Sequence, residues 1–374
     1  GTYYIQETSV PSPYVLDATV QSINWVAGQT NRFTQTNQVA KGQISVTKVD
    51  NNNKTYQGAV YNILNSSGTV VDTITTGANG TATSIPLDLG TYSVVETSAP
   101  NPLLLDPTPI TVTLAYANQT TPVVSQSVTQ SNDIAVGRVE ITKQSTDGSL
   151  VEGAVYDILN ASGTVVDTIT TGANGVATSI ELPLGNYTAV EKSVPSPYIL
   201  DATPIAVSLV YVNQTTPVVT GRATQTNEIA KGQFSIHKTD SEIPELNLAD
   251  AHYEIYDSTG AVVGTLVTDG EGFAQSPVLP LGTYTYQEVV APEGYNFDET
   301  VHSVTLAYQD MNTPLVTVHQ ERVNEVIKGR IQVVKVDSNN EEIPVQGAVF
   351  GVYNASDNSL IEEITSDIDG FAYS

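Results

Sequence analysis

A repeat of 95 residues constrains the fold more than any other feature of the sequence. Residues 58–85 and 153–180 differ at only three of 28 positions, and the two segments lie 95 residues apart. A looser copy occupies 251–274, and its opening recurs from Gly347. A unit that recurs at a fixed spacing is a single structural module, so we expect the chain to fold as tandem domains.

A short pattern, N-x-[IV]-[AI]-[KV]-G, marks each junction between repeats. It begins at Asn37, Asn132, Asn227 and Asn324. These junctions predict three complete repeats flanked by the second half of one repeat and the first half of another. The predicted domains are 1–40 (second half), 41–135, 136–230 and 231–327 (complete), and 328–374 (first half).

Each repeat has the composition and spacing of an all-β domain. Val, Ile, Thr and Tyr alternate in short runs that are separated by turn residues. The segments 65–68 and 77–80 are predicted hairpin turns in which glycine supplies a positive φ. No segment keeps a period of 3.6 residues, so we expect little helix. Repeats of this size with six or seven strands favour immunoglobulin-like β-sandwiches, which short linkers would join into an elongated rod.

Charge and composition exclude several classes of function. The net charge of −26 argues against binding to nucleic acid or to an anionic membrane surface. The absence of cysteine excludes disulfides, thiol catalysis and iron–sulfur sites. No apolar run approaches the roughly 18 residues that a membrane span needs, so no membrane insertion is expected. The four histidines have no metal-binding spacing, and we predict no metal and no cofactor. Because the chain opens on Gly1 without a signal peptide, we read it as part of a longer or processed protein.

A lysine recurs at the same position of the first strand of each repeat. Alternation along the strand puts Lys48 on the face of Ile44 and Val46, which is the predicted core. A buried amine requires a partner or a lowered pKa. The recurring lysines, four of the nine in the chain, are Lys48, Lys143, Lys238 and Lys335.

A glutamate and an asparagine recur at fixed distances from each lysine. In the complete repeats the glutamate precedes the asparagine by 36 residues, whereas in the first half-repeat the separation is 30. We predict that one amine, one carboxyl and one carboxamide meet in each core. The glutamates are Glu7, Glu96, Glu191 and Glu288, and the asparagines are Asn37, Asn132, Asn227 and Asn324.

Two interpretations of this trio remain open from the residues alone. In the first, the lysine and glutamate form a buried ion pair and the asparagine hydrogen-bonds to it. In the second, desolvation leaves the lysine neutral and nucleophilic, and the glutamate, held protonated, polarises the asparagine carboxamide and moves protons. The amine then displaces ammonia and an amide crosslink remains. That event is a single-turnover self-modification, not enzymatic turnover.

The motifs resemble a known family of surface domains. The runs G-[RQ]-[IVF]-x-[IV]-[TVH]-K, G-A-[VF]-[YF] and L-G-[TN]-Y-x-x-x-E, followed in each repeat by a terminal Asn, resemble the Cna-B or SpaA-type prealbumin-like domains of Gram-positive adhesins and pilins. The resemblance implies intramolecular Lys–Asn isopeptide bonds with a catalytic glutamate. It implies Lys48–Asn132 with Glu96, Lys143–Asn227 with Glu191, and Lys238–Asn324 with Glu288. In the third repeat Asp250 and His252 replace the Gly and Val of G-A-V-Y, so the local packing of this repeat is in doubt.

These patterns predict a structural stalk or fibre on the surface or cell wall of a Gram-positive bacterium. The alternative is an adhesin whose repeats bind a host or environmental ligand directly. The expected partners are further repeats or further copies of the same protein. The two half-repeats would together make one domain, so Lys335 of one molecule could join Asn37 of the next with Glu7 as the catalytic residue. Alternatively, the chain is a segment of a longer array of repeats, and the two half-repeats are the points at which that array is divided.

Overall fold

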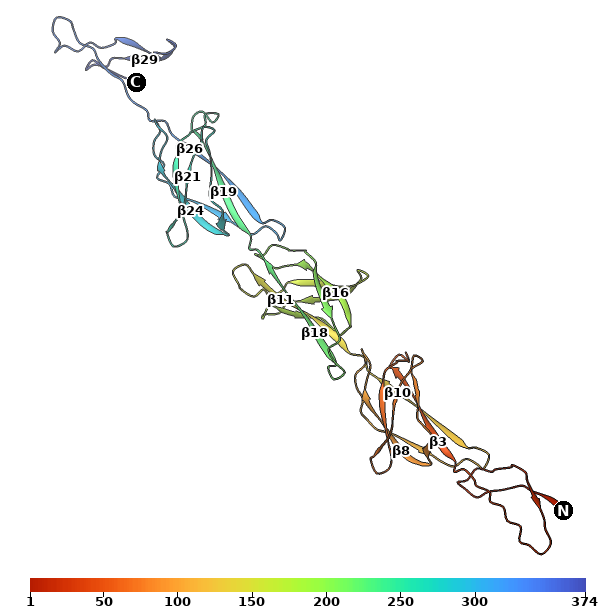
Figure 1. Ribbon diagram of the computed structural model, residues 1–374. Helices are drawn as coiled ribbons and strands as arrows, with labels where there is room; N and C mark the ends of the chain where they lie inside the picture. Colours follow the sequence, from red (N-terminus) through yellow and green to blue (C-terminus); the bar gives the residue numbers. More distant parts are fainter. The chain divides into compact units, whose positions relative to one another are not determined.

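The computed structural model describes residues 1–374, which form thirty β-strands and no helix (Figure 1). The predicted all-β class is therefore confirmed, and no segment is a helix that could cross a membrane. The chain divides into two compact units, 1–229 and 230–374. The first unit contains the N-terminal half-repeat and two complete repeats, and the second contains the third complete repeat and the C-terminal half-repeat.

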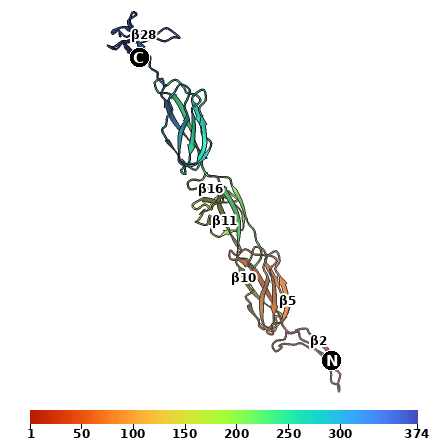
Figure 2. The same cartoon turned by 90° about the vertical axis from the view of Figure 1, so that its left-hand side faces the viewer.

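The first complete repeat is a sandwich of two four-stranded sheets. One sheet has the order β10-β3-β6, with β7 also paired to β3, and the other has the order β5-β4-β8-β9. Figure 2 shows β10 and β5, which belong to different sheets. The strands are β3 (Lys41–Asp50), β4 (Val60–Leu64), β5 (Val70–Thr75), β6 (Thr81–Thr83), β7 (Leu87–Asp88), β8 (Gly90–Ser98), β9 (Ile110–Leu114) and β10 (Val123–Asn132).

The second complete repeat has the same topology. Its sheets are β14-β11-β15, with β18 also paired to β11, and β13-β12-β16-β17. The strands are β11 (Val136–Ser145), β12 (Val155–Asn160), β13 (Val165–Thr170), β14 (Val176–Thr178), β15 (Leu182–Pro183), β16 (Gly185–Ser193), β17 (Ile205–Leu209) and β18 (Val218–Asn227).

The third complete repeat keeps this arrangement as well. Its sheets are β22-β19-β23, with β26 also paired to β19, and β21-β20-β24-β25. The strands are β19 (Lys231–Asp240), β20 (His252–Tyr256), β21 (Val262–Val267), β22 (Phe273–Gln275), β23 (Leu279–Pro280), β24 (Gly282–Val290), β25 (His302–Leu306) and β26 (Leu315–Asn324). Each repeat thus has eight strands rather than the expected six or seven, because two of them are only two or three residues long.

The first and last strands of each repeat are parallel neighbours. In the first repeat β3 and β10 pair over ten residues, with Lys48 opposite Gln130 and Asp50 opposite Asn132. The same register joins β11 to β18 and β19 to β26. This pairing brings the lysine near the end of the first strand beside the asparagine at the end of the last.

The core lies between the two sheets. In the first repeat Ile44 and Val46 of β3 pack with Tyr61 and Ile63 of β4 and with Val94 of β8. The alternation along β3 gives the expected pattern of inward and outward side chains. Lys48 continues the inward phase and is fully buried, as predicted from the alternation.

The third repeat packs normally despite its departures from the motif. Asp250 adopts a φ of 61°, in the left-handed region that Gly58 occupies in the first repeat. Its amide donates to Thr268 O, as that of Gly58 donates to Thr76 O. His252 lies on the exposed face at the start of β20, so it replaces valine without entering the core. The doubt raised by these two residues is thereby resolved.

The half-repeats at the two ends form small sheets. In the N-terminal half-repeat β1 (Thr2–Ile5) pairs antiparallel with β2 (Gln21–Asn24). In the C-terminal half-repeat β27 pairs with β30, and β28 pairs with β29. These strands are β27 (Gln332–Val334), β28 (Val349–Tyr353), β29 (Leu360–Thr365) and β30 (Phe371–Tyr373).

Both predicted turns are present in the first repeat, but only the turn at 65–68 closes a hairpin, between β4 and β5. The prediction of a hairpin at 77–80 is wrong, because that turn connects β5 to β6, which lies in the other sheet. Gly68 and Gly80 have φ values of 80° and 76°, and their amides donate to Asn65 O and Gly77 O. The two glycines differ in their surroundings. A Cβ on Gly68 would meet open space, whereas a Cβ on Gly80 would lie 2.6 Å from Thr55 Cβ and 3.1 Å from Tyr56 N.

This difference gives a testable prediction. Gly80→Ala should destabilise the first repeat more than Gly68→Ala, because both strain the backbone but only the former also displaces backbone atoms. Gly80 O accepts from Lys48 N, so the displacement also reaches β3. Hydrogen-exchange mass spectrometry of β3 and β6 measures the effect, and we expect a loss of protection of roughly 2 kcal/mol or more. Equal protection in the two variants would contradict this account.

Candidate functional site

The candidate site of the second repeat is formed by three strands from both sheets. Lys143 lies on β11, Glu191 on β16 and Asn227 on β18. All three side chains are buried, with Lys143 fully so. The structure therefore brings together the three residues whose spacing recurs in the sequence.

The carboxyl of Glu191 bridges the amine and the carboxamide. Its Oε1 lies 2.9 Å from Lys143 Nζ, and its Oε2 accepts from Asn227 Nδ2 at 2.8 Å and from Asp201 N at 2.8 Å. Asn227 Nδ2 also donates to Ile199 O at 2.7 Å. Both amide hydrogens are thus engaged away from the lysine, and Asn227 Oδ1 accepts from Lys143 Nζ.

The first repeat has the same arrangement. Glu96 Oε1 lies 3.0 Å from Lys48 Nζ, and Glu96 Oε2 accepts from Asn132 Nδ2 at 2.5 Å and from Asp106 N at 3.0 Å. Asn132 Nδ2 donates to Leu104 O at 2.6 Å. Asn132 Oδ1 is buried without a hydrogen-bond partner, so this acceptor remains available in the core.

The third repeat has the same three residues in a looser arrangement. Lys238 Nζ lies 3.4 Å from Glu288 Oε1 and donates to Val323 O at 3.1 Å. Glu288 Oε2 accepts from Asn324 Nδ2 at 2.9 Å. Here the amine is directed partly to a backbone carbonyl, and Asn324 Oδ1 is buried and unpartnered.

Burial controls the ionisation of the three lysines. Desolvation lowers the pKa of Lys143 below the ordinary value of 10.5, although the hydrogen bond with Glu191 and the charge of Glu191 act in the opposite direction. The pKa values of Lys48 and Lys238 are lowered for the same first reason. A lowered pKa increases the fraction of neutral amine, which is the nucleophilic form.

A tyrosine covers the amine in the second and third repeats, and the sequence analysis did not assign it. The Lys143 amine lies 5.7 Å from the centroid of the Tyr156 ring, and Lys238 lies 5.5 Å from that of Tyr253. Burial raises the pKa of Tyr156, so this phenol stays neutral. The signal was present in the sequence, because the tyrosine ends each G-A-V-Y motif or its variant. We read it as core packing only.

The half-repeats contain separate parts of the same site. Asn37 Nδ2 donates to Glu7 Oε2 at 2.7 Å and to Val15 O at 2.8 Å, and Glu7 Oε2 accepts from Asp17 N at 3.0 Å. These contacts reproduce the glutamate–asparagine geometry of the complete repeats despite the shorter spacing. Lys335 is partly buried, and its amine donates to Val336 O at 3.2 Å.

The arrangement can support amine chemistry without a metal. A buried amine, a bridging carboxyl and a carboxamide are the groups that an amide-exchange reaction needs. No group of three or more His, Asp or Glu side chains has the geometry of a metal site in residues 1–374.

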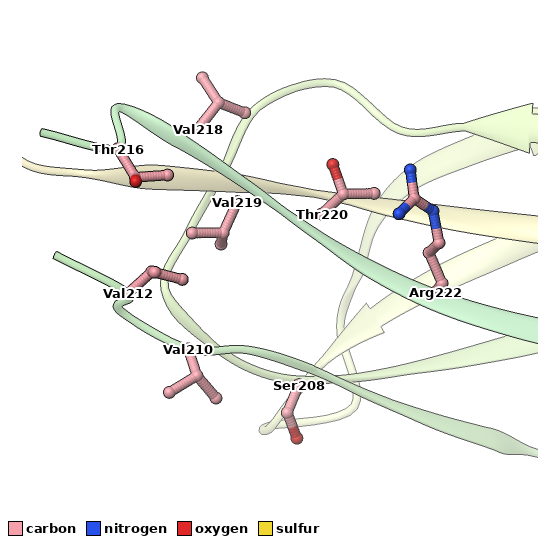
Figure 3. A pocket seen from close by; sticks show the side chains of 8 residues that line it. All are labelled: Ser208, Val210, Val212, Thr216, Val218, Val219, Thr220 and Arg222. Carbon is pink, nitrogen blue, oxygen red and sulfur yellow. The ribbon is translucent and has the colours of Figure 1, made fainter.

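A surface hollow of the second repeat provides no comparable chemistry. It is lined by residues of β17, β18 and the loop between them, and Arg222 lies at the opposite end from Thr216 (Figure 3). The Arg222 guanidinium is already paired with Glu140 at 2.7 Å. Val210 and Val212 are exposed there, and no buried polar side chain lines the hollow.

Comparison with protein families gives a match in all three complete repeats. The model of the SpaA prealbumin-like fold domain matches residues 42–129, 137–224 and 232–322. These segments cover most of the chain and contain the lysine and glutamate of each site. A search of curated protein sequences gives no match.

Among the solved structures compared, the TIE protein of Bacillus anthracis supports the same fold. The TIE protein of Bacillus anthracis is 23% identical with a TM-score of 0.55, over 83% of this chain and 55% of that one. The chain thus spans about half of that relative. BcpA, the major pilin subunit of Bacillus cereus, is 17% identical with a TM-score of 0.30, over 77% of this chain and all of that one. A streptococcal ancillary pilin is 17% identical with a TM-score of 0.26, over the same shares.

The lowered pKa of Lys143 predicts a pH dependence of stability in a variant that cannot crosslink. In Asn227→Ala the unfolded chain binds more protons than the folded chain between the folded-state pKa and 10.5, so stability should rise with pH in that window. Calorimetry from about pH 7 to 9, below the ionisation of tyrosine, measures the slope. Adding Lys143→Met should flatten it.

Lys192 provides the control for this experiment. It lies beside Glu191 in the sequence but is exposed, so adding Lys192→Met to Asn227→Ala should leave the slope unchanged. If Lys143→Met and Lys192→Met have the same effect, burial does not lower the pKa of Lys143.

Proposed function

Because the chain belongs to the family of SpaA-type prealbumin-like domains, we propose that it is a stalk segment of a Gram-positive cell-surface protein, stiffened by autocatalytic Lys–Asn isopeptide bonds. The observation that carries the proposal is the bridging glutamate. In every complete repeat one carboxyl contacts both the lysine amine and the asparagine carboxamide in a buried core.

The reaction follows from these contacts. The Lys143 ammonium group passes a proton to the Glu191 carboxylate, and the resulting neutral amine attacks Asn227 Cγ to form a tetrahedral intermediate. Glu191 Oε2 lies on Asn227 Nδ2, so the same carboxyl can deliver the proton to this nitrogen. The Cγ–Nδ2 bond breaks, ammonia leaves, and the Nζ–Cγ amide remains. Nζ loses its second proton to Glu191, which passes it to the departing ammonia, so ammonium leaves and the carboxylate is restored.

The dry core assists this step. Exclusion of water keeps the amine from being stabilised as a free ammonium ion, and it protects the intermediate from hydrolysis. Holding the three groups within hydrogen-bond distance replaces a bimolecular encounter by an intramolecular one. No cofactor has to supply chemistry in this scheme.

The position of the bond explains its use in a stalk. A crosslink between β11 and β18 joins the strands by which the chain enters and leaves the repeat. Lys143 and Asn227 are 84 residues apart, and the crosslink would enclose the segment between them, so that this segment would carry no load. By analogy with disulfides, closing a loop of this length lowers the conformational entropy of the unfolded chain and stabilises the folded domain by roughly 4 kcal/mol. The bond needs no oxidising compartment, which suits an extracellular chain without cysteine.

Direct ligand binding by the repeats has less support. The hollow on the second repeat is open, and its only cationic side chain is paired with Glu140. Three repeats with the same core and nearly duplicated segments favour a spacing role over recognition. We therefore assign the repeats to the stalk and expect their partners to be further repeats or copies of the same protein.

Intact mass under denaturing conditions tests the crosslinks. The chain should weigh less than its sequence by three molecules of ammonia, one for each complete repeat. Lys143→Ala should restore the mass of one ammonia, whereas Lys192→Ala, a control in the same repeat, should keep all three losses. Tandem mass spectrometry should find Lys143 joined to Asn227. The full theoretical mass would refute the covalent interpretation.

The half-repeats extend the proposal to joining between molecules. Glu7 and Asn37 keep the geometry of the complete sites, and Lys335 carries the amine that such a site lacks. A C-terminal half-repeat that docks on the N-terminal half-repeat of another copy would complete a domain, and Lys335 could then bond to Asn37.

Mixing variants tests this joining. The unmodified chain should form covalent multimers on a denaturing gel. Lys335→Ala and Asn37→Ala should each remain monomeric alone, because the first variant lacks the reactive amine and the second lacks the carboxamide that this amine attacks. Their mixture should form only dimers, since the Asn37→Ala chain donates its lysine to the Lys335→Ala chain. Monomers in all four samples would exclude joining by this route.

A further inference from the structure

We propose that the glutamine directly across from the reactive lysine, Gln225 in the second repeat and Gln130 in the first, is a positioning residue that holds the amine against the asparagine. This inference rests on the crosslinking reaction proposed above. It concerns a residue that lies outside the recurring trio and that the third repeat lacks.

Gln225 is fixed at both ends of its amide. It is the cross-strand partner of Lys143 in the parallel pair β11–β18, two residues before Asn227, and it is buried. Its Nε2 donates to Asp201 O at 2.8 Å. This bond determines which way the amide faces, so Oε1 points to the site and accepts from Lys143 Nζ at 3.0 Å and from Tyr156 OH at 2.7 Å.

Gln225 completes the set of acceptors around the amine. Gln225 Oε1, Glu191 Oε1 and Asn227 Oδ1 all contact Lys143 Nζ, and they match the three hydrogens of an ammonium group. After one proton passes to Glu191, the bond to Gln225 still restrains the neutral amine. Its lone pair therefore stays beside the Asn227 carboxamide instead of turning away in the cavity.

The first repeat keeps the same glutamine. Gln130 lies opposite Lys48, is buried, and donates to Asp106 O at 2.9 Å. Its Oε1, the Lys48 amine and the Tyr61 hydroxyl are all buried without a hydrogen-bond partner. The first repeat thus places an unused acceptor across from the amine, whereas the contact itself is made in the second repeat.

The third repeat has Arg322 at this position. Arg322 lies opposite Lys238, and its guanidinium stacks on Tyr286 at 5.2 Å and donates to Gln320 Oε1 at 2.9 Å. A guanidinium has no acceptor for an amine and carries a like charge. Lys238 Nζ accordingly donates to Val323 O and lies farther from its glutamate than in the other repeats. We expect this repeat to crosslink more slowly.

A time course of ammonia loss tests the proposal. The chain is made by cell-free translation, quenched in acid at intervals, digested and measured by mass spectrometry for each crosslink. In the unmodified chain the third repeat should lag behind the first two. Gln225→Met removes the acceptor at similar side-chain length, and it should slow the second repeat about tenfold or more relative to the first repeat of the same molecule.

Two further variants separate positioning from folding. Gln144→Met makes the same change on the outward face of β11, where the Gln144 amide donates to Thr226 Oγ1, and should leave the rate unchanged. Arg322→Gln should accelerate crosslinking in the third repeat. The double variant Arg322→Gln, Gln320→Ala, which copies Ala223 and Gln225 of the second repeat, should do the same. A purely structural role for this position would not produce a gain in rate.

The outcomes distinguish this inference from the proposed function. If the unmodified chain never loses ammonia, the crosslinking reaction itself is wrong and this inference falls with it. If ammonia is lost but Gln225→Met crosslinks as fast as the unmodified second repeat, or Arg322→Gln does not accelerate the third, the positioning role is refuted and the crosslinks stand.

Discussion

The structure depends on how each repeat accommodates a lysine amine in an apolar core. A lone buried ammonium would cost several kcal/mol, and removing one member of a buried pair typically costs about 3–5 kcal/mol. Glutamate, asparagine and a backbone amide satisfy the polar atoms around Lys143 together. The fold therefore has to bring the first, the last and one central strand into a fixed register, since a shift of one residue would turn the amine toward solvent.

Much of this arrangement was predictable from local patterns. The alternation of β3 placed Lys48 inward, the glycines located the turns, and the repeat length fixed the recurrence of the trio. The number of strands was underestimated because β6 and β7 are too short to give an alternating pattern. The role of Gln225 was not predictable, because an inward glutamine is equally compatible with ordinary packing, and the tyrosine that recurs in the G-A-V-Y motif was interpreted as core packing for the same reason. Their partners are contributed by distant strands that pair only in the folded domain.

The three repeats are a natural comparison series within one polypeptide. The lysine, glutamate and asparagine are the same in each, and the glutamate contacts the asparagine amide in each. What varies is the residue opposite the lysine and the direction of the amine. Gln225 offers an acceptor, whereas Arg322 introduces a second cation that occupies Tyr286 and Gln320 instead. The third site thus differs from the second at this cross-strand position within a shared backbone.

The parallel pairing of the first and last strands has a mechanical consequence that is independent of any covalent bond. When the ends of a repeat are pulled apart, β3 and β10 are drawn in opposite directions along their common axis. Their hydrogen bonds are then stretched in shear, so that ten residue pairs must yield nearly at once. A hairpin opened from one end would instead unzip pair by pair at much lower force. The topology alone therefore makes each repeat resistant to extension before any bond has formed.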